Sequence, residues 1–174
     1  MNTGIKIKGE WKFEVFSKPL TAFRGGRVSR RKLWEKKFPN GPTTLGLDQM
    51  LNSMFRAPGV EPWFIGLINN SPAPTLAAAD TMASHAGWAE LTNYGEATRP
   101  IWTEGAAAGG VITNAVQVDF TINASVLVYG GFVTSNSTKG GSTGILWATG
   151  GFDAAKAMSS GQLLRVTYSV TLTP

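Results

Sequence analysis

The feature that most constrains the fold is a strict alternation of apolar and polar residues over positions 164–172. The apolar side chains occupy every second position: Leu164, Val166, Tyr168, Val170 and Leu172. Successive side chains of a β-strand point to opposite faces of a sheet, so a period of two predicts a strand with one buried and one wet face.

The same period appears at the start of the chain. Residues 5–15 alternate between apolar side chains and lysines or glutamates, and residues 28–38 can return as a second strand, with poorer alternation. The two segments predict a basic N-terminal β-hairpin. A two-stranded ribbon is marginally stable alone, so we expect it to lie against the rest of the protein or a neighbour.

One amphipathic helix is expected at about residues 44–56. Thr43 and Thr44 offer an N-cap, and apolar residues then recur at helical spacing: Leu47, Met50, Leu51, Met54 and Phe55. The rest of the chain has the patterns of strands separated by glycine turns at 63–68, 111–122, 126–133 and 143–149, and residues 88–91 are either a short strand or an ordered loop. We therefore predict a mainly β protein with an antiparallel β-sandwich or barrel-like body.

Charge divides the chain at about residue 40. Residues 1–40 hold eleven basic and three acidic residues, whereas residues 41–174 hold five basic and eight acidic ones. We predict a basic arm or hairpin, 1–40, followed by a single β-rich domain, 41–174. A basic segment can bind an acidic protein lattice, nucleic acid or an acidic sister subunit, and it can equally be a solvated surface.

Candidate catalytic groups are few. Without cysteine and with a single histidine, the sequence excludes thiolate chemistry and sites that need two imidazoles. Ser84, His85 and Asp80 are close in sequence, but a catalytic triad is defined by geometry. Acidic residues that could form a glycosidase pair are Asp80, Glu90, Glu96 and Glu104, and we expect them to be solvated instead. We expect no enzyme activity, catalytic residue, metal or cofactor.

Two further patterns favour structure over binding. Residues 139–144 are rich in glycine, but the lysine precedes the glycines, so we predict a β-turn and not a phosphate loop. Of six tryptophans, only Trp11 and Trp34 fall in the basic segment, which makes packing a better explanation than stacking on nucleic-acid bases.

The sequence shows no membrane or export signal. Its first eight residues lack an apolar core, and the longest apolar stretch, 125–133, is interrupted by two glycines and is too short to cross a bilayer. We expect the protein to fold in a cytoplasm.

Several glycine and aromatic landmarks resemble small virion structural proteins of tailed bacteriophages. They lie at residues 9–11, 63–68, 85–90, 130–133, 141–146 and 161–168. The resemblance implies an assembly role, most simply a capsid cement or decoration protein that binds the shell as a small homo-oligomer. The proteins that it resembles are head-associated, tail or fibre-like, so the alternative is a neck or tail component, such as a collar, fibre or adaptor subunit. Two further alternatives are a glycan-binding virion domain and DNA binding by the basic segment 1–40.

Under this interpretation the partner is the major capsid protein or another virion protein, and the protein is found in the virion after assembly in the host cytoplasm. We expect the basic hairpin to supply the contact residues: Lys12, Arg27, Arg30, Arg31, Lys32, Trp34 and Lys36. Backbone hydrogen bonds at a sheet edge and long-range charge would both favour such attachment.

Overall fold

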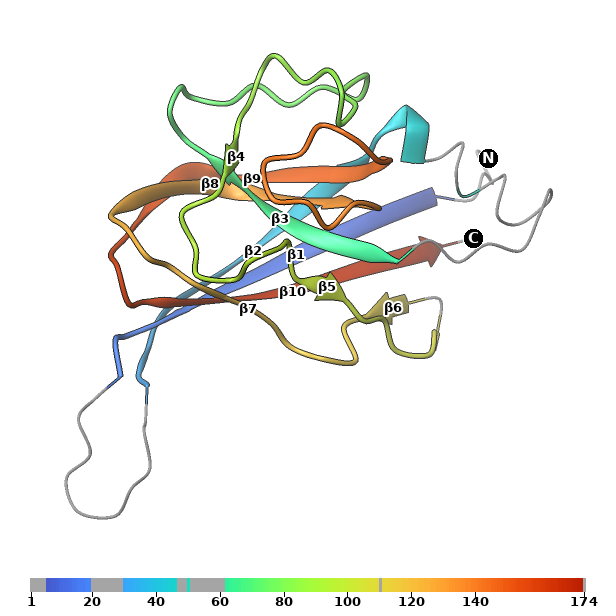
Figure 1. Ribbon diagram of the computed structural model, residues 1–174. Helices are drawn as coiled ribbons and strands as arrows, with labels where there is room; N and C mark the ends of the chain where they lie inside the picture. Colours follow the sequence, from blue (N-terminus) through green and yellow to red (C-terminus); the bar gives the residue numbers. More distant parts are fainter. Residues whose placement is uncertain (1–5, 20–29, 47–49, 51–61, 110, 174) are drawn as a thin grey trace.

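The computed structural model describes residues 6–19, 30–46, 50, 62–109 and 111–173 (Figure 1). Their strands are β1 (Lys6–Phe16), β2 (Lys32–Pro42), β3 (Trp63–Asn69), β4 (Glu90–Leu91), β5 (Ile101–Trp102), β6 (Val111–Thr113), β7 (Val118–Thr121), β8 (Val126–Thr134), β9 (Leu146–Met158) and β10 (Leu163–Thr173). All paired strands are antiparallel, and the sheet curls into a half-barrel, which confirms the predicted mainly β, barrel-like body.

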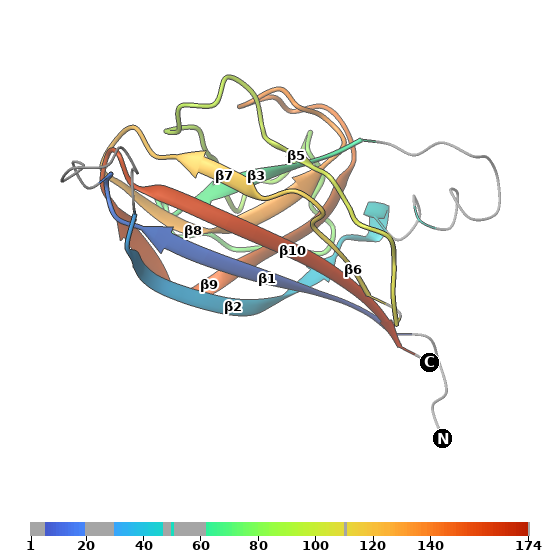
Figure 2. The ribbon, with the colours of Figure 1, turned by 90° about the horizontal axis from the view of Figure 1, so that it is seen from below.

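The sheet has two walls, which meet where β2 pairs with β9. Along the sheet the order is β4-β3-β8-β9-β2-β1-β10-β6, with β5 attached to β3 and β7 attached to β10. Figure 2 shows β2, β1 and β10 on the near wall and β3 and β8 behind them. β2 pairs with β1 from Gly9 to Phe16 but meets β9 at only two positions, Gly41–Thr149 and Pro42–Ala148. Beyond these pairs the two walls separate.

The first strand of the chain lies inside the sheet. β1 pairs with β2 on one side and with β10 on the other, where the register runs from Lys6–Thr173 to Phe16–Leu163. Its inward residues Trp11, Phe13 and Val15 are at most 1% exposed. The described parts of segments 1–40 and 41–174 therefore share one sheet and one core.

The core is built from aromatic side chains of both walls. Phe152 of β9 packs against Phe38 of β2 and Phe13 of β1, with ring centroids 4.7 and 5.0 Å apart. On β10, Leu164, Val166 and Tyr168 are buried, as the alternation of residues 164–172 predicts.

The segment 111–122 was predicted as one strand, and that prediction is wrong. It forms β6 and β7, which pair with different parts of β10, and Asn114 lies between them. The Asn114 side chain accepts a hydrogen bond from the Tyr168 backbone N–H (2.8 Å) and donates one to the Val166 carbonyl (3.1 Å). The Asn114 side chain thus supplies hydrogen-bond partners to the β10 backbone between its pairings with β6 and β7.

β9 is longer than the predicted strand 143–149. It begins at Leu146 and continues through Gly150 and Gly151 to Met158.

The predicted helix lies partly in the described residues: Thr44, Leu45, Gly46 and Met50 are helical, and residues 47–49 and 51–56 lie outside them. The Gly46 N–H donates to Thr43 Oγ1 at 3.0 Å, which is the geometry of an N-cap.

Candidate functional site

The residues predicted to contact a partner do not form one surface. Lys12 and Lys32 lie on the outer face of the β1–β2 hairpin, whereas Trp34 and Lys36 lie toward β9. Arg30 and Arg31 immediately precede β2, and Arg27 lies outside the described residues.

The outer lysines of the hairpin are neutralised by carboxylates. Lys12 Nζ lies 3.2 Å from Glu14 and 3.5 Å from Glu35, and Lys32 Nζ lies 3.2 and 2.8 Å from the same two residues. Hydrogen bonding to Lys32 lowers the pKa of Glu35, and Glu35 and Glu14 raise the pKa of Lys32. These cations are engaged within the hairpin.

Trp34 and Lys36 connect β2 to β9 where the two strands separate. The Trp34 ring packs edge-on against Phe152, with centroids 5.7 Å apart, and Lys156 Nζ lies 5.9 Å from the centroid of the Trp34 ring. Lys36 Nζ is 2.9 Å from Asp153, and this hydrogen bond lowers the pKa of Asp153. Both predicted contact residues therefore have partners within the protein.

We define the hairpin end as Lys18, Arg30 and Arg31. Its cations differ from Lys12, Lys32 and Lys36 in their contacts. Within the described part of the chain, none of these three cations lies within 4.0 Å of a carboxylate. The segment is anchored by its backbone, because the Ser17 N–H donates to the Arg31 carbonyl at 2.8 Å. Arg30 donates to the carbonyls of Ser17 (3.0 Å) and Gly161 (3.1 Å), whereas Lys18 and Arg31 are exposed.

The sequence around the hairpin end holds the entire net charge of the protein. Residues 17–31 contain five basic and no acidic residues, and the other residues contain eleven of each. The sequence prediction omitted Lys18, although the absence of acidic residues from 17–31 was a signal that could have identified it.

Asp80 and His85 are engaged with Trp88 and not with each other. The Trp88 indole N–H donates to Asp80 Oδ2 at 3.0 Å, and the Ala77 N–H donates to the same oxygen at 2.9 Å. The His85 ring stacks on Trp88 with centroids 4.0 Å apart, and His85 Nδ1 lies 3.0 Å from the Trp88 carbonyl oxygen. Asp80 and His85, two of the residues considered for a catalytic triad, thus fix the loop around Trp88.

Glu90 forms the most buried ion pair of the described residues. Arg99 Nη2 lies 2.7 Å from Glu90 Oε2 and Arg99 Nε lies 3.0 Å from Oε1, and the Arg99 side chain is fully buried. Arg99 also donates to the carbonyls of Asn136 and Gly141, while the Gly140 N–H donates to Glu90 at 2.8 Å. The pair holds the loop between β8 and β9 against the segment that follows β4.

The predicted turn at 139–144 is confirmed as part of that loop. Gly140 and Gly144 have φ values of 75° and 98°, a region that favours glycine. Lys139 Nζ donates to the carbonyls of Tyr94 and Glu96 and lies 4.2 Å from the Tyr94 ring centroid. Burial, together with the charge of Glu90, raises the pKa of Tyr94 well above its usual value.

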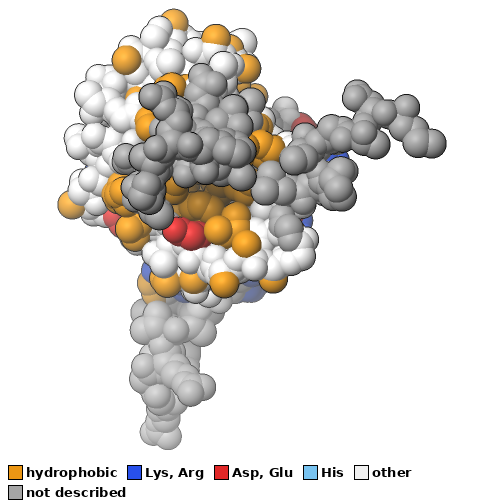
Figure 3. Space-filling model, turned by 90° about the vertical axis from the view of Figure 1, so that its right-hand side faces the viewer, with side chains coloured by type: hydrophobic (Ala, Val, Ile, Leu, Met, Phe, Trp, Pro, Cys, Tyr) orange, Lys and Arg blue, Asp and Glu red, His pale blue; other side chains and the backbone are white. Residues whose placement is uncertain are grey.

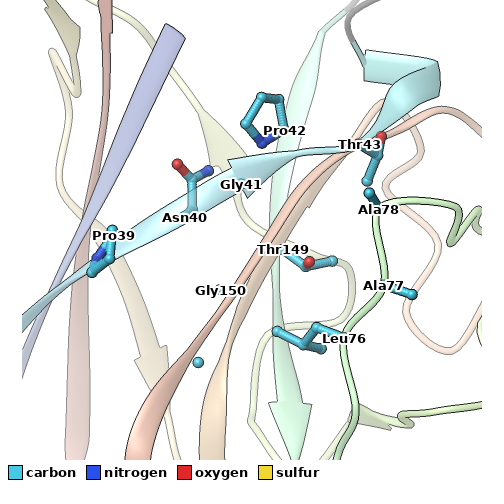
Figure 4. Close-up of a pocket in the computed structure, with 11 residues that line it drawn as sticks. Pro39, Asn40, Gly41, Pro42, Thr43, Leu76, Ala77, Ala78, Thr149 and Gly150 are labelled. Atoms are coloured by element: carbon cyan, nitrogen blue, oxygen red, sulfur yellow. The ribbon is translucent and has the colours of Figure 1, made fainter.

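A pocket of about 280 Å³ lies where β2 and β9 separate (Figure 4). Asn40 and Pro42 of β2 lie on one side, Leu76 and the following loop on the other, and Thr149 and Gly150 of β9 between them. Because the lining is backbone, glycine, proline, alanine and threonine with one leucine and one asparagine, the pocket offers no charged group to a ligand.

Figure 3 shows the end of the molecule where β6 lies. Hydrophobic side chains gather in the hollow middle of this face, beside an acidic group. In β5 and β6, Ile101 and Val111 are 54% and 37% exposed.

Among the described residues, no three His, Asp or Glu side chains form a group that could hold a metal ion. No helix among them is long and apolar enough to span a bilayer.

Comparison with known proteins adds no relative. The sequence matches no protein-family model and no curated protein at a significant level.

Proposed function

We propose that the protein is a structural subunit of a tailed-bacteriophage virion, a capsid cement or decoration protein that attaches through its hairpin end. The observation that carries this proposal is the location of charge. Lys18, Arg30 and Arg31 lack carboxylate partners among the described residues, and the segment containing them holds the whole net charge of +5.

This distribution favours attachment in one orientation. The remainder of the chain has equal numbers of acidic and basic residues, so long-range attraction to an acidic surface acts mainly on one end of the molecule. Charge complementarity of this kind accelerates encounter and fixes orientation more than it raises affinity. The hairpin end adjoins β1 and β2, and β1 pairs with both β2 and β10, so the hairpin end is attached to central strands of the sheet.

The resemblance to phage virion proteins suggests the partner, an acidic surface of the major capsid protein or of another virion protein. Repetition of the site over a symmetric particle, or on a small homo-oligomer of this chain, would convert weak single contacts into stable attachment. The same contact could serve in the neck or tail, and copy number per particle distinguishes the two positions.

The test uses particles assembled without this protein. Purified protein is added back, and its copies per particle are measured by quantitative mass spectrometry at increasing salt. The unmodified protein should bind in hundreds of copies for a cement protein or in about a dozen for a neck or tail subunit, and high salt should weaken binding.

Charge-reversal variants locate the contact. Lys18→Glu with Arg31→Glu should reduce binding at least about tenfold, because like charges then face each other. Lys8→Glu is the matched control, since Lys8 is also exposed but lies near the opposite end of β1. Equal binding of the double variant and the control would refute attachment through the hairpin end. Tight binding to duplex DNA with no binding to particles would replace the proposal with a nucleic-acid function.

A further inference from the structure

A second pocket, of about 510 Å³, lies where β3 and β9 end and β8 begins. We call it the end pocket, and its lining residues are Asn69, Ser71, Leu91, Asn93, Ser125, Val126, Leu127, Ala157, Met158 and Ser159. Its volume is in the range of pockets that hold small molecules in proteins, roughly 300–1,000 Å³.

The residues that line the end pocket are either polar or apolar, and none of them is charged. Five are neutral and polar, and five are apolar. Within the described part of the chain, the polar side chains of Asn69 and Asn93 form no hydrogen bond, and neither do the three serine hydroxyls. Leu127 is 44% exposed, so an apolar surface is available beside them.

This chemistry discriminates between ligand classes. An ionic ligand would find no opposite charge in the end pocket, and a purely apolar ligand would remove water from the amides without replacing its hydrogen bonds, which is costly. Amide and hydroxyl groups both donate and accept, and a ligand that carries many hydroxyl groups matches that pattern. The C–H face of a sugar ring can then pack on Leu127.

We propose that the end pocket binds an uncharged sugar unit of a glycan. The Asn69 and Asn93 amides hydrogen-bond its hydroxyl groups, and Leu127 contacts its apolar face. This inference does not depend on the proposed virion attachment, because none of the lining residues belongs to the hairpin end.

The test is a titration of the isotope-labelled full chain with neutral oligosaccharides built of glucose, galactose or mannose, followed by NMR. At least one sugar should shift the side-chain amide signals of Asn69 and Asn93. Asn69→Ala and Asn93→Ala should each weaken binding about three- to tenfold, as expected for one lost hydrogen bond. Asn123→Ala is the matched control, because Asn123 is exposed and does not line the pocket.

Three results would overturn the proposal. One is no shift at the pocket with any neutral oligosaccharide, and another is unchanged affinity of both asparagine variants. The third is selective binding of a neutral extended peptide in place of the sugars, which would assign the pocket to protein recognition. The amide spectrum of each variant verifies folding, and Leu127→Ala, which should also weaken sugar binding, tests the apolar contact independently.

Discussion

The Trp11 indole occupies the space that a side chain at residue 150 would need, since a Cβ added to Gly150 would lie 2.5 Å from Trp11 Nε1. Trp11 is fully buried on β1, and Gly150 lies on β9, so the contact joins the two walls of the half-barrel. A glycine in the interior of β9 is thus required by close packing and not by a turn.

Gly150→Ala should therefore destabilise the protein by about 1–3 kcal/mol, the usual cost of overpacking a core. The free energy of unfolding is measured by urea denaturation. Gly41→Ala, in the neighbouring strand β2, is the control, because a Cβ there would have no atom within 4 Å. Equal stabilities of the two variants would show that Trp11 can move away at little cost.

Asn114→Ala should cost about 3 kcal/mol, at roughly 1 kcal/mol for each lost hydrogen bond. Its side chain bonds to the backbone of Val166 and Tyr168 and accepts a bond from Trp102 Nε1 at 2.8 Å. Thermal unfolding of this variant is compared with that of Asn123→Ala, whose side chain is exposed. A loss below about 0.5 kcal/mol, the lower limit for one hydrogen bond, would mean that water replaces the amide on β10.

Arg99→Met should cost about 3–5 kcal/mol, because it leaves the buried carboxylate of Glu90 without its cation. We also expect faster hydrogen exchange at the Gly140 amide, whose acceptor is Glu90. Arg165→Met is the control: its pair with Asp119 is partly exposed, so the loss should stay below about 1 kcal/mol. A similar loss of unfolding free energy in both variants would contradict the prediction that the buried Arg99–Glu90 pair matters more than the partly exposed one.

Alkaline pH should unfold the protein through its buried tyrosines. Burial raises the pKa of both Tyr94 and Tyr168 above that of a free phenol, so folding favours their neutral form. Their contribution to stability is complete below the unfolded pKa of about 10 and is lost as pH rises above it.

The measurement follows phenolate absorbance and circular dichroism together in a Tyr94→Phe, Tyr129→Phe variant, in which Tyr168 is the remaining tyrosine. The two signals should change at the same pH. Ionisation of Tyr168 in a protein with native circular dichroism would disprove the prediction.

The sequence predicted the strands whose apolar and polar residues alternate. β1 and β10 have one face in the core and one in water, so the period of two is visible in each of them. The full length of β9 was not predictable, because Gly150 and Gly151 have the composition of a turn. They are strand residues because they pair with Gly131 and Gly130 of β8, and the Trp11 and Tyr129 side chains leave no room for a Cβ at either position.

Which basic residues have carboxylate partners within the protein was not predictable, for a similar reason. A count of charges identified the basic N-terminal segment. Whether a lysine there has a carboxylate partner depends on which residue lies opposite it on the neighbouring strand. Lys32 pairs with Glu35, three residues away, and also with Glu14, eighteen residues away on β1, while Lys36 pairs with Asp153 on β9. The register that brings these groups together follows from the assembled sheet, whereas the acid-free segment 17–31 can be recognised without it.

The pairing of β1 with β10 also sets an order in which this protein can fold. During synthesis β1 lacks its long partner strand until residues 163–173 have been made, so the contacts between the two strands form only after all the residues between them have been synthesised. The same register places Lys6 beside Thr173 at one end of the strand pair and Phe16 beside Leu163 at the other.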